Sequence, residues 1–423
     1  MSVYLCTICN IYAYDEKKGD IKNNLKPKTL YDDIPNSFRC PICNSKKELF
    51  IKISKKDENK FIEKYQLYIK MNTSKEEKLT LVKVRNKARE RLKSVCAVNR
   101  ICDGELDRLC MGQKYGQSIG LGGIGKGLSF RANVQALDNI KLKTRLISEH
   151  AEPDLSTTFL KQKIDIPIMS SSLSGVKASM GGAISEIEFA TSVLQGAKDA
   201  GTIGWIGNTC DEGQELTGIE AVKKIGFGIP IFKPQDNKRL LELIKKAEQA
   251  NAIAVGVDLD GVGSINWEIR NKPVYRKSVN DLIELVDSTD LPFIAKGIMS
   301  VDDTFLVLDS KVSSIDVSNH GGRALDSTRG VAEVLPEIVK AVKGKITVTA
   351  GGGIRTGFDV LKILALGADG ALIGRDIIRS AIGGGANGVK LHLEYLKSDL
   401  RRGMIQTSCN SIDKIDEKIL DKQ

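Results

Sequence analysis

The chain has no run of 18 apolar residues, and only three of its 423 residues are histidines. A membrane-spanning helix needs about 18 or more apolar residues in succession, so the sequence excludes a membrane span. Residues 1–6 lack the basic and apolar regions of a signal peptide, and we therefore expect a cytoplasmic protein. Lys and Arg outnumber Asp and Glu, 63 to 53, but form no dense block interleaved with aromatic residues. We therefore expect no binding to nucleic acid. The pattern indicates a lysine-rich surface, which could attract a small anionic substrate.

Nine cysteines are too few for a disulfide scaffold in a chain of this length. Four of them form two CxxC pairs, Cys6 with Cys9 and Cys40 with Cys43. Two such pairs can place four thiolates around one metal ion, at about 2.3 Å from it. Zinc and iron both accept this set of ligands, so the spacing predicts a metal site in residues 1–55 and leaves the metal open.

Short apolar runs and helical stretches alternate in the second half of the chain. Helical spacing over about 56–95, with a break near 72–74, is followed by a glycine-rich stretch from 96 to 127, and we interpret 56–130 as a linker. The pattern over 131–410 predicts a (β/α)8 TIM barrel, with an open doubly wound sheet as the alternative. We expect a charged tail over 411–423. The predicted strands are 166–171, 203–207, 229–232, 252–259, 293–298, 315–318, 346–350 and 370–374.

The predicted strand ends carry residues that suit catalysis and phosphate binding. His320 and Arg323 follow the sixth strand, where an imidazole can take a proton and a guanidinium can hold a carboxylate. Glycine-rich turns after the last two strands of a barrel often bind phosphate. No GxGxxG motif stands in the strand-turn-helix setting that a dinucleotide needs, so a mononucleotide is favoured over a dinucleotide. The predicted phosphate residues are Gly351, Gly352, Gly353, Arg355, Gly374 and Arg375.

The N-terminal region resembles rubredoxin over its full length. Besides the four cysteines, the resemblance rests on the segments 12–15, 19–20, 34–35 and 38–43. It implies a single iron that carries one electron at a time, with a structural zinc ribbon as the alternative. Asn10 and Asn44 stand where rubredoxins usually have glycine, but asparagine tolerates the left-handed backbone that such a turn needs.

Residues 130–410 resemble the FMN-dependent 2-hydroxy acid dehydrogenases and oxidases, the family of glycolate and lactate oxidase. The run 318–326 carries the likeness, which is supported by Lys296 at the end of the fifth strand and Asp258 at the end of the fourth. The resemblance implies that His320 is the base, Arg323 the carboxylate clamp and Lys296 the cation beside the flavin. It also implies that Asp258 raises the basicity of the histidine and that Ser318 lies against FMN.

The sequence departs from that family at several positions. Lys233 stands in place of a tyrosine, Gly256 of a threonine and Gly351 of an aspartate, and the loop 261–265 lacks a second arginine. We therefore expect a substrate that differs from a simple 2-hydroxy acid, with Lys233 supplying part of the lost positive charge. Three further cysteines, Cys96, Cys102 and Cys110, stand in a segment similar to that of anaerobe proteins in the same family. They could be metal ligands or ordinary thiols.

Together these features predict an FMN-dependent oxidoreductase that exchanges electrons with its own iron centre, in either direction, and with an external partner. The resemblance also implies a homo-oligomer. The alternatives are an FMN-dependent isomerase of the type 2 isopentenyl diphosphate kind, a rubredoxin-fed reductase, and a non-enzymatic binding module. Retention of Lys296, His320 and Arg323 argues against the last.

Overall fold

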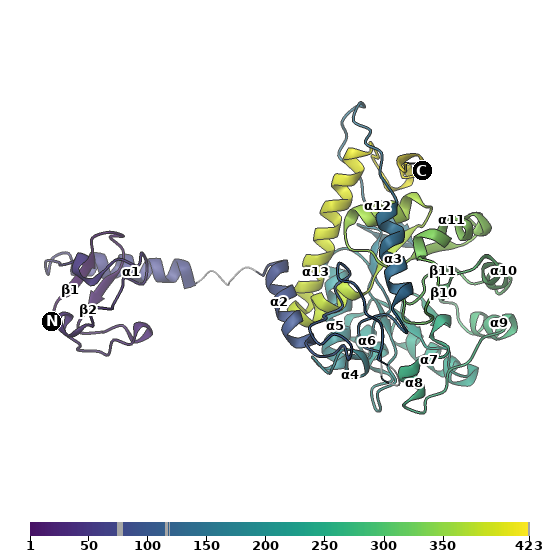
Figure 1. Ribbon diagram of the computed structural model, residues 1–423, viewed down its shortest axis with the longest axis horizontal. Helices are drawn as coiled ribbons and strands as arrows, with labels where there is room; N and C mark the ends of the chain where they lie inside the picture. Colours follow the sequence, from purple (N-terminus) through teal and green to yellow (C-terminus); the bar gives the residue numbers. More distant parts are fainter. Residues whose placement is uncertain (74–78, 115–116, 118, 422–423) are drawn as a thin grey trace. The chain divides into compact units, whose positions relative to one another are not determined.

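A computed structural model describes residues 1–73, 79–114, 117 and 119–421. The chain divides into two compact units, Met1–Lys78 and Leu79–Gln423 (Figure 1). The predicted linker is thereby shared between the units: α1 (Glu58–Thr73) lies in the first and α2 (Leu81–Leu92) in the second. Residues 74–78, 115, 116 and 118 of that linker and residues 422–423 of the predicted tail lie outside the described residues. No helix in the described ranges has the length and apolar character needed to cross a bilayer.

The first unit is built around a small antiparallel sheet in the order β2-β1-β3. Its strands are β1 (Val3–Cys6), β2 (Ala13–Asp15) and β3 (Phe50–Lys52). Aromatic rings fill the core next to the cysteines, with Tyr4 stacked on Tyr31 at 3.8 Å between centroids. Three single turns of 3-10 helix, η1 (Ile21–Asn23), η2 (Tyr31–Asp33) and η3 (Lys47–Leu49), complete the unit.

The second unit contains eight parallel strands that neighbour one another in sequence order. The barrel closes between β6 and β7 through a parallel bridge from Leu173 to Ile206. Closure excludes the open doubly wound sheet and confirms the predicted barrel, because every predicted run contributes one strand. The strands are β6 (Ile168–Ser170), β7 (Trp205–Gly207), β8 (Ile229–Phe232), β9 (Val255–Asp258), β10 (Phe293–Ile298), β11 (Ser314–Val317), β12 (Thr347–Ala350) and β13 (Gly370–Ile373).

Helices surround this barrel (Figure 1), and their apolar faces pack on the outer faces of the strands. Polar side chains begin many of them; Ser278 and Thr356, for example, form capping boxes with the acid three residues on. The helices are α3 (Leu128–Asn139), α4 (Val176–Ser179), α5 (Glu186–Asp199), α6 (Thr217–Ile225), α7 (Asn237–Gln249), α8 (Ile265–Glu268), α9 (Val279–Asp287), α10 (Val301–Asp309), α11 (Val331–Val342), α12 (Gly357–Ala365) and α13 (Arg375–Gln406), with a 3-10 turn η4 (Leu259–Gly261).

A β-hairpin that the sequence analysis missed precedes the barrel. It joins β4 (Thr157–Phe159) to β5 (Gln162–Ile164). Its turn residues, Leu160 and Lys161, have φ of 44° and 68°, a left-handed conformation that Asn-Gly pairs normally supply. The hairpin's apolar residues pack on the residues that fill the barrel interior. This burial stabilises the turn, although the local sequence has no turn motif.

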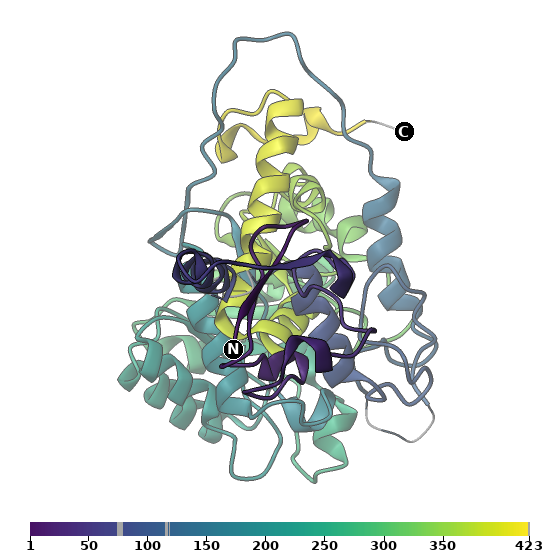
Figure 2. The ribbon, with the colours of Figure 1, turned by 90° about the vertical axis from the view of Figure 1, so that its left-hand side faces the viewer.

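The residues after α13 pack on the rest of the second unit. Residues 411–421 form two 3-10 turns, η5 (Ile412–Lys414) and η6 (Glu417–Ile419), and Leu420 makes a β-bridge with Leu142. Figure 2 shows this end of the chain beside the long segment that follows α3. The C-terminal residues, predicted as a charged tail, thus also bury apolar side chains, among them Ile419.

The long helix α13 contains a glycine run, 383–385, of which Gly383 and Gly384 contact α2. Gly385 interrupts the helix, with φ of 57° and ψ of −149°, a conformation that glycine adopts at low cost. Gly383 has a different function: a Cβ there would lie 2.0 Å from the carbonyl oxygen of Val84. At Gly384 the nearest atom is a side-chain carbon of Val84, 2.9 Å away.

We therefore expect Gly383→Ala to lower the free energy of unfolding of the second unit, by about 2 kcal/mol, because the clash is with backbone. Gly384→Ala is the matched control, since a side chain can move and alanine gains about 1 kcal/mol of helix propensity over glycine. Urea unfolding followed by circular dichroism would measure both. Equal losses would contradict the close approach of α2 and α13.

Candidate functional site

The four cysteines of the first unit form a preorganised metal site. All four sulfur atoms lie within 4.8 Å of one another. The Sγ atoms of Cys6 and Cys43 are 3.6 Å apart, and those of Cys9 and Cys40 are 3.8 Å apart. Ligands at 2.3 Å in a tetrahedron are separated by about 3.8 Å, so the sulfurs already stand at the spacing that one tetrahedral ion needs. Asn10 and Asn44, with φ of 50° and 60°, adopt the left-handed conformation expected of the two knuckle turns.

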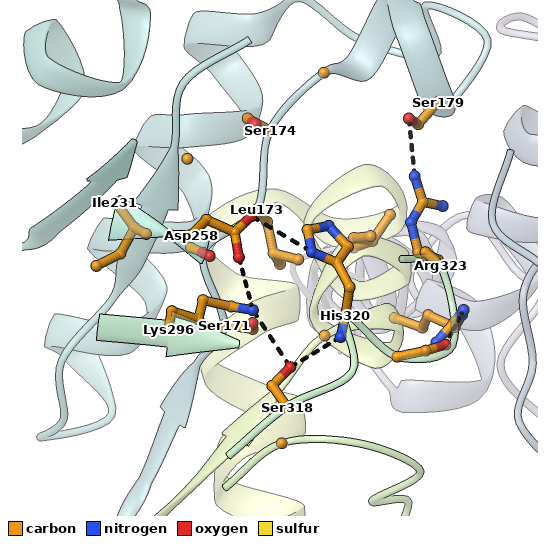
Figure 3. Close-up of a pocket in the computed structure, with 18 of the residues that line it drawn as sticks. Ser171, Leu173, Ser174, Ser179, Ile231, Asp258, Lys296, Ser318, His320 and Arg323 are labelled. Carbon is orange, nitrogen blue, oxygen red and sulfur yellow. Dashed lines mark hydrogen bonds and ion pairs between the residues drawn. The ribbon is translucent and has the colours of Figure 1, made fainter. Parts of the chain in front are cut away.

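A pocket opens at the carboxyl ends of the barrel strands, where barrel enzymes hold their active sites. It collects most of the predicted site residues (Figure 3). In that view Asp258 and Lys296 lie on one side of His320, and Arg323 lies on the other. The predicted residues that line the pocket are Lys233, Asp258, Lys296, Ser318, His320, Arg323, Gly351, Gly352, Gly353, Gly374 and Arg375. Arg355 does not line it.

The loop after β11 presents His320 to the pocket through an unusual backbone. His320, Gly321 and Gly322 all have positive φ, of 57°, 65° and 78°. The two glycines adopt this conformation at low cost, whereas a histidine does so less readily. The loop is held by the N–H of His320, which donates to Ser318 Oγ at 3.1 Å, and by that of Gly322, which donates to Asn319 Oδ1 at 3.0 Å. These two hydrogen bonds fix the backbone on either side of the imidazole.

Two carboxylates face the same imidazole nitrogen. His320 Nδ1 lies 2.8 Å from Asp260 Oδ1 and 3.4 Å from Asp258 Oδ2. The nearer acid, Asp260, was not predicted; it follows the end of β9 by two residues, a spacing that could have indicated a second acid at the strand end. A carboxylate at Nδ1 stabilises the tautomer with hydrogen on that nitrogen. The lone pair of Nε2 is thereby left to face the pocket.

Asp258 is the centre of a buried charge network. It accepts an ion pair from Lys233 Nζ, and its Oδ1 lies 3.1 Å from Lys296 Nζ. Burial acts to raise the pKa of Asp258, but Lys233, Lys296 and His320 outweigh it and hold that pKa well below its usual range. The carboxylate is thus ionised at neutral pH and balances the cations around it.

Lys296 is almost fully buried at the end of β10. Burial alone would lower its pKa, but attraction by Asp258, Asp260 and Asp316 raises the pKa above its ordinary value. Its Nζ also donates to Ser318 Oγ at 3.3 Å. Asp316 lies on β11, the neighbouring strand, where burial raises the pKa of its carboxyl to about 7, against the opposing effect of Lys296. Lys296 therefore stays a fixed cation at the pocket wall.

Two further cations, Lys233 and Arg323, line the pocket. Lys233 Nζ lies 3.5 Å from His320 Nε2. Arg323 donates to the carbonyl of Gly120 and, at 3.2 Å, to Ser179 Oγ. Burial lowers the pKa of Arg323 to about 10, so it remains protonated at neutral pH. The loop after β9 lacks the second arginine that the family carries there. The nearest arginine along the described chain, Arg270, is paired with Asp211 at 3.2 Å.

The predicted phosphate residues divide into two groups. The glycines after β12 and β13 line the pocket, and a Cβ on Gly374 would meet no atom within 4 Å. Arg375 also lines the pocket but donates to the carbonyls of Leu121 and Gly321, at 2.6 and 2.9 Å. Arg355 instead pairs with Asp107, at 2.9 Å, and with Asp138. The structure therefore does not place Arg355 with the other phosphate residues.

Residues of α3 hold the loop after β11 and were not predicted. Asn133 and Asn319 exchange two amide hydrogen bonds, of 2.7 and 3.1 Å. Asp326 accepts hydrogen bonds from the N–H groups of Leu128 and Ser129, at 2.7 and 3.1 Å, at the start of that helix. These contacts join residues nearly 200 positions apart, so no local pattern could have announced them.

Comparison with known proteins matches both units to families. Residues 119–280 and 275–422 match the family described as FMN-dependent dehydrogenase, and residues 3–50 match rubredoxin. 2-Hydroxyacid oxidase 1 of Mus musculus is 31% identical over 334 residues, which make up 69% of this chain and 87% of the relative. Glycolate oxidase of Spinacia oleracea is 30% identical over 323 residues, covering 67% of this chain and 85% of the relative.

Solved structures give the same result for the barrel. Mandelate oxidase with (S)-2-phenylpropionate superposes with a TM-score of 0.64 at 26% sequence identity, covering 82% of this chain and 98% of the other. Mandelate oxidase with 3,3-difluoro-2-hydroxy-3-phenylpropionic acid also gives a TM-score of 0.64 at 26% identity. Both matched families are redox proteins, so the isomerase alternative is not favoured.

Proposed function

We propose that this chain, which belongs to the FMN-dependent dehydrogenase family and carries an N-terminal rubredoxin domain, oxidises a small anionic substrate of the 2-hydroxy acid type and exchanges the electrons with iron in that domain. The chain is an FMN-dependent oxidoreductase by its family. The observation that supports the finer proposal is the convergence of His320, Lys233, Lys296 and Arg323 on one pocket.

The pocket residues fit a flavin mononucleotide. The open space at Gly374 lies where helix α13 begins, and free N–H groups at a helix N-terminus bind phosphate. Lys296 provides a buried cation for the ring system, and Asn208 contributes a buried side-chain N–H with no hydrogen-bond partner among the described residues. Bound FMN would supply the acceptor for two electrons, which side chains cannot provide.

The side chains divide the remaining tasks. Arg323 and Lys233 would hold the substrate carboxylate by charge-assisted hydrogen bonds. His320 Nε2 would take a proton from the substrate, while Asp258 and Asp260 stabilise the imidazolium that forms. Oxidation of a 2-hydroxy acid to a 2-oxo acid releases two electrons and two protons. The rubredoxin domain would carry one electron at a time, so an external one-electron acceptor must empty it twice per substrate.

Anaerobic mixing with a panel of 2-hydroxy acids tests the proposal. The oxidised protein should show flavin absorbance near ~450 nm together with ferric-thiolate bands. A substrate should bleach the flavin first and the iron bands afterwards. Bleaching of the flavin with unchanged iron bands would contradict internal electron exchange, and no bleaching by any 2-hydroxy acid would contradict the substrate class.

Lys233 gives a further prediction, because its ammonium is expected to contact the substrate. Lys233→Met should raise KM for the anionic substrate about tenfold, the equivalent of one charge-assisted hydrogen bond of about 1.4 kcal/mol. Stopped-flow reduction of the flavin at varied substrate concentration would measure it. Lys238→Met, on the exposed surface of α7, removes the same charge and should leave KM unchanged. An unaltered KM in the Lys233 variant would remove this residue from the substrate site.

A further inference from the structure

Three cysteines of the second unit have no part in the proposed reaction. Cys96, Cys102 and Cys110 lie in the segment between α2 and α3, and all three are free thiols. The same segment reaches the flavin pocket, because Leu106 and Leu121 line it. These cysteines therefore lie close in the fold to the redox site.

Backbone N–H groups point at each of the three sulfurs. Asn99 N donates to Cys96 Sγ at 3.4 Å, and Gly104 N donates to Cys102 Sγ at 3.4 Å. Cys110 Sγ accepts two such bonds, from Gly112 N at 3.4 Å and Gly123 N at 3.1 Å. A neutral thiol is a weak acceptor, whereas N–H donors around a metal-bound thiolate stabilise its charge and set its potential. The loop is therefore built for sulfur that carries negative charge.

Glycines make the turns around Cys110 possible. A Cβ on Gly127 would lie 2.9 Å from Cys110 Sγ, and one on Gly122 would lie 3.3 Å from it. Gly112 has φ of 84° and a Cβ there would meet a carbonyl oxygen at 2.1 Å. The backbone thus approaches this sulfur more closely than side chains would allow.

Ion pairs hold the same loop in place. Asp103, next to Cys102, is paired with Arg89 at 3.3 Å, Arg108 at 3.6 Å and Arg379 at 3.7 Å. The three arginines also contact Glu105, and Arg379 pairs with Asp376 at 2.8 Å, so three carboxylates balance three guanidinium groups. The position of Cys102 is therefore fixed by its neighbours in the fold.

The three cysteines share one folded loop, but their sulfurs are not arranged for a single ion. Ser94 N donates to Arg100 O at 2.8 Å and Cys102 N to Asn99 O at 2.9 Å, which turns the chain back between Cys96 and Cys102. A Cβ on Gly104 would lie 2.9 Å from Leu121, and one on the adjacent Gly122 would lie 3.3 Å from Cys110 Sγ. In the described part of the chain, the four sulfurs of the first unit lie within 4.8 Å of one another, but the sulfurs of Cys96, Cys102 and Cys110 do not form such a group. A polynuclear cluster, in which each thiolate binds a different iron, separates its ligands further than one ion does.

We propose that Cys96, Cys102 and Cys110 hold an iron–sulfur cluster beside the flavin pocket. Thiolates are the usual ligands of such clusters, and three of them bind three irons. The cluster would take up and give back one electron without making or breaking a covalent bond, so it adds a second one-electron centre to the chain. Its presence does not depend on the substrate of the flavin site.

Anaerobically purified full-length protein tests this inference directly. We expect acid-labile sulfide together with more than one iron per chain, and a low-temperature EPR signal after reduction or oxidation that differs from that of rubredoxin iron. Absence of sulfide, both as isolated and after incubation with ferrous iron and sulfide, would overturn the proposal. Zinc at these cysteines without sulfide would overturn it equally.

Variants separate this centre from the others. The triple change Cys96→Ser, Cys102→Ser and Cys110→Ser should remove the sulfide and leave the rubredoxin iron bands. Cys409→Ser, at a buried cysteine away from this loop, is the matched control and should retain sulfide. Should the triple variant not fold, each single variant should still lower the sulfide content. Sulfide retained in a folded triple variant would contradict the assignment, whereas flavin reduction by substrate can persist in either case.

Discussion

Replacing His320 with glutamine should slow reduction of the flavin by substrate about 10²- to 10⁴-fold, the contribution of a positioned general base. Glutamine keeps a polar side chain of similar length but cannot accept and carry a proton. The negative charges of Asp258 and Asp260, which hold Nδ1 at 3.4 and 2.8 Å, then have no imidazolium to stabilise. Rapid mixing under anaerobic conditions, read at the flavin band, gives the rate constant.

His150→Gln is the matched control, because this histidine is exposed and distant in sequence from every pocket residue. It should reduce at the rate of the unmodified protein. Both variants should retain flavin, since the predicted phosphate glycines are unchanged. A His320 variant that bound FMN and reduced it at the original rate would show that the base is another group, and the role proposed for the loop after β11 would be wrong.

Removing two ligands of the four-cysteine site should prevent metal binding there. It should thereby separate reduction of the flavin by substrate from electron transfer to an external acceptor. We expect Cys9→Ser with Cys40→Ser to lose the iron, because the oxygen ligands that replace two thiolates bind it far less well. Binding of a structural metal is also folding free energy, so the first unit should lose its own unfolding transition. The second unit has a separate core and should keep its flavin and its reduction by substrate.

The decisive measurement is turnover with an external one-electron acceptor. In the double variant it should fall to the rate at which the flavin unit alone reduces the acceptor, while single-turnover reduction of the flavin stays the same. Cys409→Ser carries the same chemical change in the second unit and should alter neither rate. Unchanged turnover in the double variant would mean that the rubredoxin domain is not on the electron path.

The barrel was predictable because burial on both faces makes each parallel strand a short apolar run. Eight such runs separated by helical stretches leave few arrangements, and all eight became strands. The hairpin β4–β5 was missed because the barrel interior, and not its Leu-Lys turn, stabilises it. The same reason explains Gly383, whose role depends on a helix about 300 residues earlier in the chain.

The candidate site was predictable where a residue lies near the carboxyl end of a strand. Lys296 lies in the second half of β10, His320 and Arg323 lie in the loop after β11, and all three line one pocket. Arg355 follows the same rule, yet it turns to Asp107 and Asp138, because a strand end fixes where a side chain starts and not where a long one points. Asp260 and Asn133 were missed, the first for lack of a motif and the second because its partner is remote in sequence.

The contacts between α3 and the loop 319–328 determine where this protein can be divided for expression. A fragment starting at residue 131, the beginning of the barrel by sequence pattern, would lack Ser129, whose hydroxyl accepts the N–H of Thr328 at 2.8 Å. It would also lack the amide groups that Asp326 binds. Such a truncation should yield a barrel with a poorly ordered histidine loop. A fragment starting at Leu79 keeps the whole second unit and is the shorter piece in which catalysis can be studied alone.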